Sequence, residues 1–565
     1  MTAKRHRDGV KPIVSTPSNI ASYLPRVAAD RPNALAIACP AGRDSSGRPA
    51  YTHLTYSELD AVSGHIARGL EARGIGRGVR TVLMVRPSLD LFSLVFGMFK
   101  VGAVPVLIDP GIGRHHLKQC IANAEPEAFI GVPAAQAARV IFGWGRSTID
   151  HIVTVGRRGP WGGTTLHAIV EHGRRSGSRE PADVSSDEMA AIVFTSGSTG
   201  PPKGVIYRHG NFLAQVEAIR ELFDLQPGEV DLPTFPLFAL FDPALGMTTV
   251  IPDMDPTRPA RVDPKKIIEP IEHFGVTMMF GSPALLDTVG RYGERHDVRL
   301  PTLKKVLSAG APVSPQVIGR FSRMLPSDAK VLTPYGASEA LPVAVISSHE
   351  ILAETGARTD QGAGVCVGHP VPSIELEVIK ISDDQIANWD PSLVVPRGEI
   401  GEIVVKGPQV TGAYYNAERH NLLGKITDAD GHIRHRMGDL GYLDDEGRLW
   451  FVGRKSQRVT VGGEAMYTVP CEAVFNTHPA VFRSALVGVG EGDSTRPVLC
   501  VELESDVTAD RETVASELLE IGARYEHTRS IQTILFHPGF PVDIRHNAKI
   551  GRGQLAQWAD KKLTT

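Results

Sequence analysis

Short apolar segments alternate with helical patterns through the first half of this 565-residue chain. TVLMV at 81–85 and AVPVLID at 103–109 are typical of buried strands, and the helical pattern at 91–101 separates them. Neighbouring parallel strands require such a crossover, which is usually a helix. The alternation therefore predicts an α/β fold whose mainly parallel sheets are flanked by helices.

The same pattern places loops where ligands bind. AAIVF at 190–194, VTMMF at 276–280 and KKVLSAG at 304–310 each run into a loop that contains Gly or Ser. In open α/β sheets, ligands bind at the carboxyl ends of the strands. We therefore expect the functional residues at these loops.

The hydrophobic pattern of the chain changes from alternating helices and strands to short strands after about residue 365. IELEVIK at 374–380, GEIVVKG at 401–407 and RLWFVGR at 448–454 are short alternating strands. We predict a basic leader at 1–16, a large N-terminal domain at 17–454 with a β-rich subdomain at about 365–454, and a C-terminal domain at 455–565. The last is a small α+β unit, which a hinge of one or two residues at 454–456 would leave mobile.

Composition and charge narrow the function classes. The net charge is −3, which does not favour binding to nucleic acid or to an acidic membrane. The five cysteines are scattered, without the spacing of a metal site, so a reducing cytoplasm is the expected location. The most apolar stretch, 89–110, contains charged residues, Gly and Pro, and predicts a helix and a strand without a transmembrane segment. These features are typical of a small-molecule enzyme.

The strongest local motif is TSGSTGPPKG at 195–204, directly after the strand at 190–194. Its glycines allow the backbone to approach an anion, its hydroxyls can donate to phosphate oxygens, and Lys203 adds positive charge. It is not a Walker A loop, because Gly204 follows the lysine where Ser or Thr is required. The motif predicts a phosphate site.

This loop resembles that of the adenylate-forming superfamily of acyl-CoA synthetases, luciferases and peptide-synthetase adenylation domains. Further motifs follow in the family's order: SAGAP at 308–312, YGASEA at 335–340, MGDLGYLDDEGRLWFVGR at 437–454 and DIRHNAKIGR at 543–552. The resemblance implies a site for ATP and Mg²⁺. Its nucleotide-binding residues would be Thr195, Ser196, Gly197, Ser198, Thr199, Gly200, Lys203, Gly310, Ala311, Pro312, Tyr335, Gly336, Ser338, Asp439, Arg454 and Lys549.

The resemblance also implies individual roles. Tyr335 would stack on adenine, Asp439 would bind the ribose hydroxyls and Glu339 would hold Mg²⁺. Two anions meet when a carboxylate attacks the α-phosphorus, so cations must surround them. Lys549 would reach the developing charge from the C-terminal domain, and the predicted catalytic residues are therefore Lys549, Glu339, Lys203 and Thr195. Taken singly, Asp439 could be a turn aspartate and Glu339 a helix N-terminal acid.

Several positions depart from the family's usual pattern. Ser456 stands at the hinge, Thr460 replaces a lysine used in a second conformation, and Ala239 stands where a gating histidine is common. Asn547 and Ala548 replace the usual Thr-Gly before the catalytic lysine. Neutral drift is the alternative explanation for all of them.

FPLFALFDP at 235–243, GGEAMYTVPCE at 462–472 and RHNAKIGR at 545–552 resemble one branch of the superfamily, the bacterial olefin-biosynthesis β-lactone synthetases. This resemblance implies a long-chain 2-alkyl-3-hydroxy acid as substrate, lactone closure by its own 3-hydroxyl without CoA, and assembly with other olefin-pathway enzymes. An internal nucleophile is already positioned for attack. A long-chain fatty acyl-CoA ligase is one alternative, and a non-catalytic adenylate-binding subunit is another.

Candidates for the acyl site and the general base stay open. The apolar segments at 236–246 and 276–283 could line a tunnel for alkyl chains or could be ordinary core. His349, His369, His435 and His546 are the candidate bases, although a lone histidine is more often structural.

Overall fold

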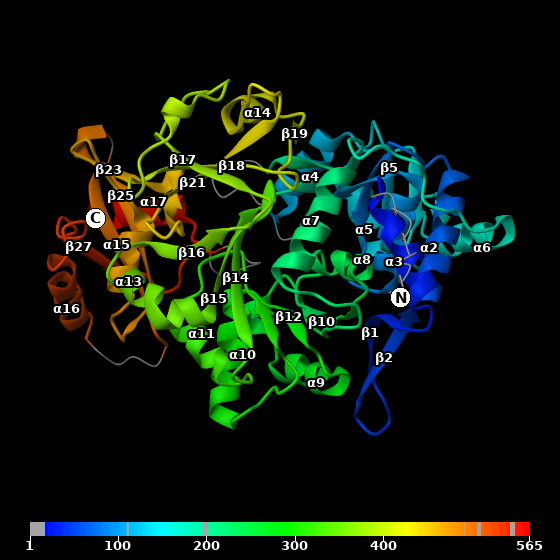
Figure 1. The fold of residues 1–565 in the computed structure, drawn as a ribbon, viewed down its shortest axis with the longest axis horizontal. Coiled ribbons are helices and arrows are strands. Elements are labelled where there is room, and N and C mark those ends of the chain that lie inside the picture. Colours follow the sequence, from blue (N-terminus) through cyan, green and yellow to red (C-terminus); the bar gives the residue numbers. More distant parts are fainter. Residues whose placement is uncertain are drawn as a thin grey trace, which may run out of the picture.

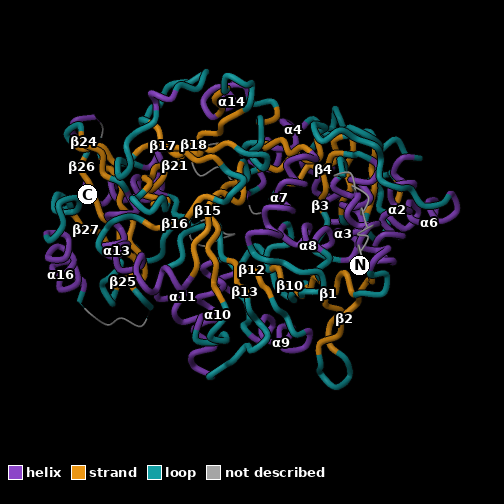
Figure 2. Tube along the Cα trace, in the orientation of Figure 1, coloured by secondary structure: helices purple, strands orange, loops and turns teal. Residues whose placement is uncertain are grey.

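The computed structural model describes residues 17–109, 112–195, 202–490, 492–505, 510–542 and 549–564. Two large sheets and a smaller C-terminal sheet organise these residues, and helices pack along them (Figures 1 and 2). In Figure 1 the blue and cyan part of the chain lies on the opposite side of the molecule from the orange and red C-terminal part. The predicted α/β class is confirmed.

The largest sheet has fourteen strands. The pairs β1–β11, β11–β10, β10–β12, β12–β13 and β13–β14 are parallel, and the other pairs are antiparallel. In spatial order the strands are β17 (Glu375–Ile379), β18 (Gly401–Lys406), β21 (Ile433–Leu443), β22 (Leu449–Arg454), β16 (Val365–Pro370), β15 (Ala340–Ser347), β14 (Lys330–Ala337), β13 (Lys305–Leu307), β12 (Met278–Phe280), β10 (Val230–Pro233), β11 (Thr248–Val250), β1 (Leu35–Arg43) and β2 (Pro49–Thr55), with β20 (Lys425–Thr427) beside β21.

The β-rich part of the chain is the antiparallel half of this same sheet. It joins the parallel half through β15 and β16, where Ala344 pairs with Pro370 and Val345 with His369. The strands expected at 374–380, 401–407 and 448–454 are β17, β18 and β22. The residues from 365 onward therefore extend the main sheet.

The second sheet has eight strands, and five of its neighbouring pairs are parallel. Two antiparallel strands, β9 and β19, continue it at one edge. Its order is β19 (Tyr414–Tyr415), β9 (Gly204–Arg208), β8 (Met189–Phe194), β4 (Val104–Leu107), β3 (Arg80–Met84), β5 (Ala128–Gly131), β6 (His151–Thr154) and β7 (Thr164–Thr165).

Helices alternate with these strands along the chain, as the sequence pattern predicts. They are α1 (Tyr23–Asp30), α2 (Tyr56–Glu71), α3 (Leu89–Val101), α4 (Arg114–Ala124), α5 (Pro133–Phe142), α6 (Leu166–Ser176), α7 (His209–Leu222), α8 (Asp242–Leu245), α9 (Lys265–Phe274), α10 (Pro283–His296), α11 (Pro315–Ser322), α12 (Ser348–Glu350), α13 (Gly356–Asp360) and α14 (Glu418–Gly424).

The most apolar stretch forms α3 followed by β4. Ser88 caps the first turn of α3, and Gly102 ends the helix at φ 76°, a left-handed conformation that glycine adopts without a steric cost. The helix is buried from Leu91 to its end, and the ammonium of Lys100 is neutralised by Asp60 Oδ1 at 2.6 Å. None of the helices in the described part of the chain combines the length and apolarity that crossing a membrane requires.

Residues after Arg454 build a separate sheet, called here the C-terminal unit (455–564). Antiparallel β25 (Val481–Val489) and β26 (Arg496–Leu503) pair, and β27 (Thr533–Phe536) lies parallel to β26. The other elements of the unit are a 3-10 turn at Lys455–Gln457, β23 (Val459–Val461), β24 (Glu464–Met466), α15 (Thr468–Phe475), α16 (Arg511–Ala523) and α17 (Arg552–Thr564).

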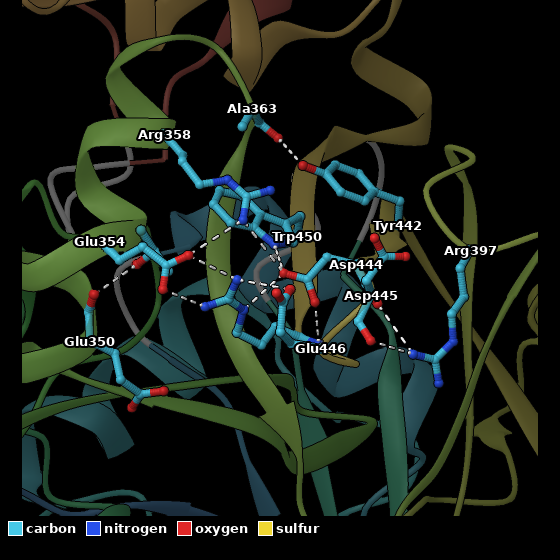
Figure 3. A network of polar contacts seen from close by, with 12 residues as sticks. Glu350, Glu354, Arg358, Ala363, Arg397, Tyr442, Asp444, Asp445, Glu446 and Trp450 are labelled. Carbon is cyan, nitrogen blue, oxygen red and sulfur yellow. Dashed lines mark hydrogen bonds and ion pairs between the residues drawn. The ribbon is translucent and has the colours of Figure 1, made fainter.

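A polar network joins the β21–β22 hairpin to the helical segment before α13 (Figure 3). The carboxylate of Asp444 accepts hydrogen bonds from Trp450 Nε1 and Arg448 Nε, both at 2.8 Å. Arg448 also donates to both oxygens of Glu354, at 3.0 and 3.1 Å. Arg358 lies 4.3 Å above the Trp450 ring. Because Asp444 and Arg448 are both buried, their charges depend on one another.

We predict that Arg448→Met lowers the free energy of unfolding by about 3 kcal/mol, because it leaves the buried Asp444 carboxylate with Arg358 alone as its cation, whose Nη1 lies 3.8 Å from its Oδ2. Arg397→Met is the matched control: Arg397 is exposed and donates to carbonyls of the same hairpin turn. We expect the control to change stability by less than about 0.5 kcal/mol. Urea unfolding followed by near-UV circular dichroism measures both, and equal shifts would contradict the assignment.

Two buried carboxyl groups, one on β10 and one on α8, lie close to each other. Asp231 on β10 and Asp242 at the start of α8 are both buried, and burial raises the pKa of each, with the neighbouring Asp242 carboxyl raising the pKa of Asp231 further. Thr249 Oγ1 donates to Asp242 Oδ2 at 2.8 Å. Two carboxylates this close cannot both ionise readily, so the folded pair retains a proton.

This pair predicts a pH dependence of stability. The unfolded chain releases the proton above the ordinary pKa of aspartate, so unfolding releases protons and stability falls as pH rises through the raised folded pKa. Asp231→Asn replaces the shared proton by an amide N–H. We expect its free energy of unfolding, relative to the parent protein, to increase by about 1 kcal/mol or more between about pH 5 and pH 8. A constant difference across that range, measured by urea unfolding, would refute the shared proton.

Candidate active site

A cavity of about 2660 Å³ is lined by residues of both large sheets and of the C-terminal unit. Each predicted nucleotide-site residue that the structure describes lines it: Thr195, Lys203, Gly310, Ala311, Pro312, Tyr335, Gly336, Ser338, Glu339, Asp439, Arg454 and Lys549. The predicted residues Ser196, Gly197, Ser198, Thr199 and Gly200 lie outside the described residues. Motifs that are far apart in the sequence therefore meet at one cavity.

Thr195 and Lys203 flank the predicted phosphate loop. β8 ends at Phe194 and the antiparallel β9 begins at Gly204, so the loop connects two neighbouring strands of a hairpin. The backbone N–H of Thr195 donates to the carbonyl of Lys203 at 3.0 Å, which closes the base of the loop. Burial lowers the pKa of Lys203, while the Glu339 carboxylate acts in the opposite direction.

Asp439 forms the centre of a buried polar cluster. It lies within the strand β21, in register with Arg454 on β22, and is therefore not a turn aspartate. Tyr335 Oη donates to its Oδ2 at 2.7 Å, and Arg454 Nε lies 3.0 Å from its Oδ1. Burial raises the pKa of Asp439, against the opposing effect of Arg454.

Asp439 Oδ1 is buried and forms an ion pair with Arg454 but accepts no hydrogen bond from the described residues. A buried carboxylate oxygen without a donor is destabilising unless a ligand supplies one. Because Asp439 lines the cavity, a ligand hydroxyl could donate to this oxygen. The geometry fits the predicted contact with a ribose.

Glu339 lies at the turn between β14 and β15 and is therefore not a helix N-terminal residue. Its Oε1 accepts a hydrogen bond from Tyr414 Oη at 2.7 Å. The Nζ atoms of Lys203 and Lys425 each lie 5.3 Å from the centre of the Tyr414 ring. Two ammonium groups thus contact the aromatic ring that holds the Glu339 carboxylate.

The backbone around Glu339 is fixed as well. Thr411 donates to the Glu339 carbonyl from its N at 2.8 Å and from its Oγ1 at 3.1 Å. Lys425 Nζ donates to the Thr411 carbonyl at 2.5 Å, and burial lowers the pKa of Lys425 to about 7. Tyr207 Oη donates to the carbonyl of Ser338 at 2.5 Å. The turn that carries Glu339 is held from three sides.

This donor set fits magnesium only together with phosphate oxygens. Among the described residues, no three His, Cys, Asp or Glu side chains are placed to hold a metal by themselves. Mg²⁺ commonly binds through one or two carboxylates and the phosphates of a nucleotide, which Glu339 and the nearby cations suit.

Lys549 lines the same cavity from the C-terminal unit, and its charge lowers the pKa of Asp439. The segment that carries it is anchored by Arg552, which donates to Glu472 Oε1 at 2.5 Å and to Oε2 at 2.9 Å. Arg552 Nε also donates to Gln457 Oε1 at 3.2 Å, next to the predicted hinge. The position of Lys549 is therefore coupled to the hinge.

An apolar part of the cavity adjoins these groups. Aromatic side chains line it: Phe238, Phe241 and Phe280 from the predicted acyl segments, and Phe235 directly before the first of them. The rings of Phe238 and Phe280 lie 4.5 Å apart. Ala239, at the expected gate position, is fully buried in the core beside these residues and does not line the cavity. Position 239 therefore supplies no gating side chain, and the aromatic residues next to it in sequence line the space.

The histidine candidates separate by position. His349 and His369 are exposed and do not line the cavity, so neither fits a base there. His546 lies outside the described residues. His435 lines the cavity, with Nδ1 2.9 Å from the Gly424 carbonyl, and burial holds its pKa well below the ordinary value.

Sequence reasoning missed Tyr414, Lys425, Thr411 and Tyr207. The segment TGAYY at 411–415 carries no local signature of a site, and Lys425 looks like any strand lysine. They reach Glu339 because β19 pairs with β9 and β20 pairs with β21.

Comparisons with known proteins agree with this geometry. The model of the family described as "AMP-binding enzyme" matches residues 24–415. A protein named olefin beta-lactone synthetase from Xanthomonas campestris pv. campestris is 52% identical over 97% of this chain and 98% of its own length. Another protein of that name, from Stenotrophomonas maltophilia, is 51% identical over 97% of this chain and 99% of its own length. The structure of the anthranilate CoA ligase AuaEII in complex with anthranoyl-AMP superimposes on this chain with a TM-score of 0.79. The two sequences are 17% identical, and the match covers 98% of this chain and 99% of that one.

The chain therefore belongs to the AMP-binding enzyme family, and it is an AMP-forming ligase. Within that family it groups with the olefin β-lactone synthetases. The resemblance inferred from the motifs is confirmed.

We predict that Tyr414→Phe raises the Mg²⁺ concentration for half-maximal pyrophosphate release about tenfold, because it removes a hydrogen bond to the charged Glu339 and keeps the ring. Tyr415→Phe is the control, since Tyr415 is the adjacent aromatic residue and contacts Arg80 through its ring. The assay titrates Mg²⁺ at saturating ATP and acid. An unchanged Mg²⁺ requirement in Tyr414→Phe would exclude a role in placing Glu339.

Proposed function

We propose that this enzyme converts a long-chain 2-alkyl-3-hydroxy acid and ATP into a β-lactone, AMP and pyrophosphate. The observation that carries the proposal is that one cavity joins a nucleotide cradle to an aromatic-lined space, in a chain 52% identical to an olefin beta-lactone synthetase. Such an enzyme would act in olefin biosynthesis.

In the first step the substrate carboxylate attacks the α-phosphorus of ATP, and pyrophosphate leaves. Asp439 and Arg454 would hold the ribose, and Tyr335 would form one wall of the adenine site. Lys203 and Lys549 would offset the negative charge that gathers between the carboxylate and the phosphates. Magnesium bound at Glu339 would neutralise phosphate charge.

In the second step the substrate's own 3-hydroxyl oxygen attacks the acyl carbon. A new C–O bond closes the four-membered ring, the hydroxyl proton is released, and the bond from the acyl carbon to AMP breaks. The aromatic side chains around Phe238 would exclude water, which would otherwise hydrolyse the adenylate. Proximity replaces a second substrate in this step.

The decisive assay supplies a synthetic 2-alkyl-3-hydroxy acid with ATP and Mg²⁺ and omits CoA. We expect one β-lactone and one AMP for each pyrophosphate, identified by NMR and mass spectrometry. The same acid without its 3-hydroxyl should release pyrophosphate only in an amount near that of the enzyme, because the adenylate has no internal nucleophile. Turnover that requires CoA would identify an acyl-CoA ligase.

Lys549→Ala should slow adenylate formation about a hundredfold or more, because a preorganised charge at the reacting centre is lost. Lys562→Ala, on the exposed surface of α17, is the control and should not change the rate. Single-turnover pyrophosphate release measures both variants. An unchanged rate in Lys549→Ala would remove this residue from the mechanism.

The five cysteines are buried and unpaired, which supports a reducing cellular compartment. Association with other enzymes of olefin biosynthesis stays a prediction of the family resemblance.

A further inference from the structure

The C-terminal unit packs on the rest of the chain where α15 contacts β22 and α13, and ion pairs join it to the N-terminal part at two places. At the hinge, Lys455 Nζ lies 3.1 Å from Glu402 Oε2, and Arg458 Nη2 lies 2.5 Å from Asp383 Oδ2. Away from the hinge, one ion pair among the described residues crosses between the units: Arg291 Nη2 lies 3.1 Å from Glu504 Oε1. This second contact resists rotation of the unit about the hinge.

Arg291 is held in place on its own side. It lies on α10, where Asp287 accepts from its Nε at 2.8 Å. Asp287 in turn accepts from Arg320 Nη1 at 2.6 Å. Glu504 directly follows β26, so its backbone is tied to the central strand of the C-terminal sheet. The ion pair thus connects two rigid elements.

The pair also lies at the cavity. Arg291, Asp287 and Glu504 all line it, together with Thr288 and Ala284 of α10. The same cavity receives Lys549. An orientation that closes the Arg291–Glu504 contact is therefore the one in which Lys549 faces the Asp439 cluster.

The chemistry of the second step bears on whether this orientation must change. A ligase that accepts a separate second substrate has to open a path for it after the adenylate forms. A hydroxyl already on the adenylate needs no such path and reacts faster if water stays excluded. Nothing in this reaction calls for rotation between the two steps.

We propose that the Arg291–Glu504 pair is a latch and that the C-terminal unit keeps this one orientation through both adenylation and lactone closure. The claim that the Arg291–Glu504 pair holds the C-terminal unit depends on geometry alone. The claim that the unit keeps one orientation through adenylation and lactone closure rests on the proposed function. Arg291 and Glu504 act as positioning residues, because they act through Lys549 and touch no reacting atom.

A crosslink tests the single orientation. Since all five native cysteines are buried, the double variant Arg291→Cys with Glu504→Cys offers two new accessible thiols to a short bismaleimide. The enzyme is loaded with 3-hydroxy acid and ATP without Mg²⁺, crosslinked, and started by adding Mg²⁺. We expect one turnover that yields both AMP and lactone, at a rate near that of the parent enzyme and above that of the uncrosslinked variant, which lacks the ion pair.

Other outcomes decide against the proposal in distinct ways. Adenylate without lactone in the crosslinked enzyme would mean that the unit must rotate between the steps. No adenylate at all would mean that the latched orientation is not the adenylating one. If the uncrosslinked enzyme also forms adenylate without lactone, the proposed function fails while the latch remains tested by adenylation. Parent enzyme treated with the reagent controls for modification of native thiols.

Charge exchange tests the latch itself. Arg291→Glu and Glu504→Arg should each slow adenylation about fivefold, the effect expected for a half-exposed pair. The combined exchange should restore the rate to within about twofold, because the pair re-forms with its charges reversed. About 1 M salt should slow the parent enzyme and leave the single variants unchanged, since it screens exposed charges.

Arg323→Glu is the matched control, because Arg323 is exposed and pairs with Glu294 within the N-terminal part. We expect this variant to keep the parent rate. Failure of the combined exchange to restore adenylation would overturn the latch.

Discussion

The buried carboxylate of Asp439 is the constraint on which the rest of the site depends. It can be ionised in the interior only because Arg454 and Tyr335 compensate it, and these partners come from two other strands of the same sheet. Arg454 is also the last residue of β22, directly before the turn that leads to the C-terminal unit. The nucleotide cradle and the hinge are therefore built on one pair of neighbouring strands.

Charge balance explains the other half of the site. Lys203, Lys425 and Arg454 gather near Glu339, and burial lowers the pKa of both lysines. Among the described residues, the two lysines have no carboxylate nearby except Glu339, because Asp439 is paired with Arg454. A bound polyanion would therefore stabilise both ammonium groups. Tyr414 links the two parts, because its ring contacts the lysines and its hydroxyl holds the carboxylate. This arrangement of charges fits the proposed binding of ATP and Mg²⁺.

Residues in local motifs could be predicted from the sequence, whereas residues placed by the pairing of distant strands could not. Thr195, Lys203 and Glu339 could be predicted because their motifs stand in loops or turns beside apolar strands. Tyr335 and Asp439 could be predicted from their motifs, although they lie within the strands β14 and β21. The β-rich segment from about residue 365 could be predicted from its short alternating strands, but its pairing with the parallel half through β15 and β16 could not. Tyr414 and Lys425 could not be found, because their partners are chosen by the strand pairs β19–β9 and β20–β21. Register between distant strands leaves no local signal.

By itself the sequence determined the α/β class, the order of strands and helices, and the residue types that bind a nucleotide. These follow from local periodicity and from motifs whose spacing is set within a few residues. Only the tertiary structure decided that Ala239 is buried in the core, that Glu339 is held by Tyr414, and that Arg291 meets Glu504 across the two units. Such contacts depend on how whole elements pack, and the energy of packing is shared among many residues that are far apart in the chain.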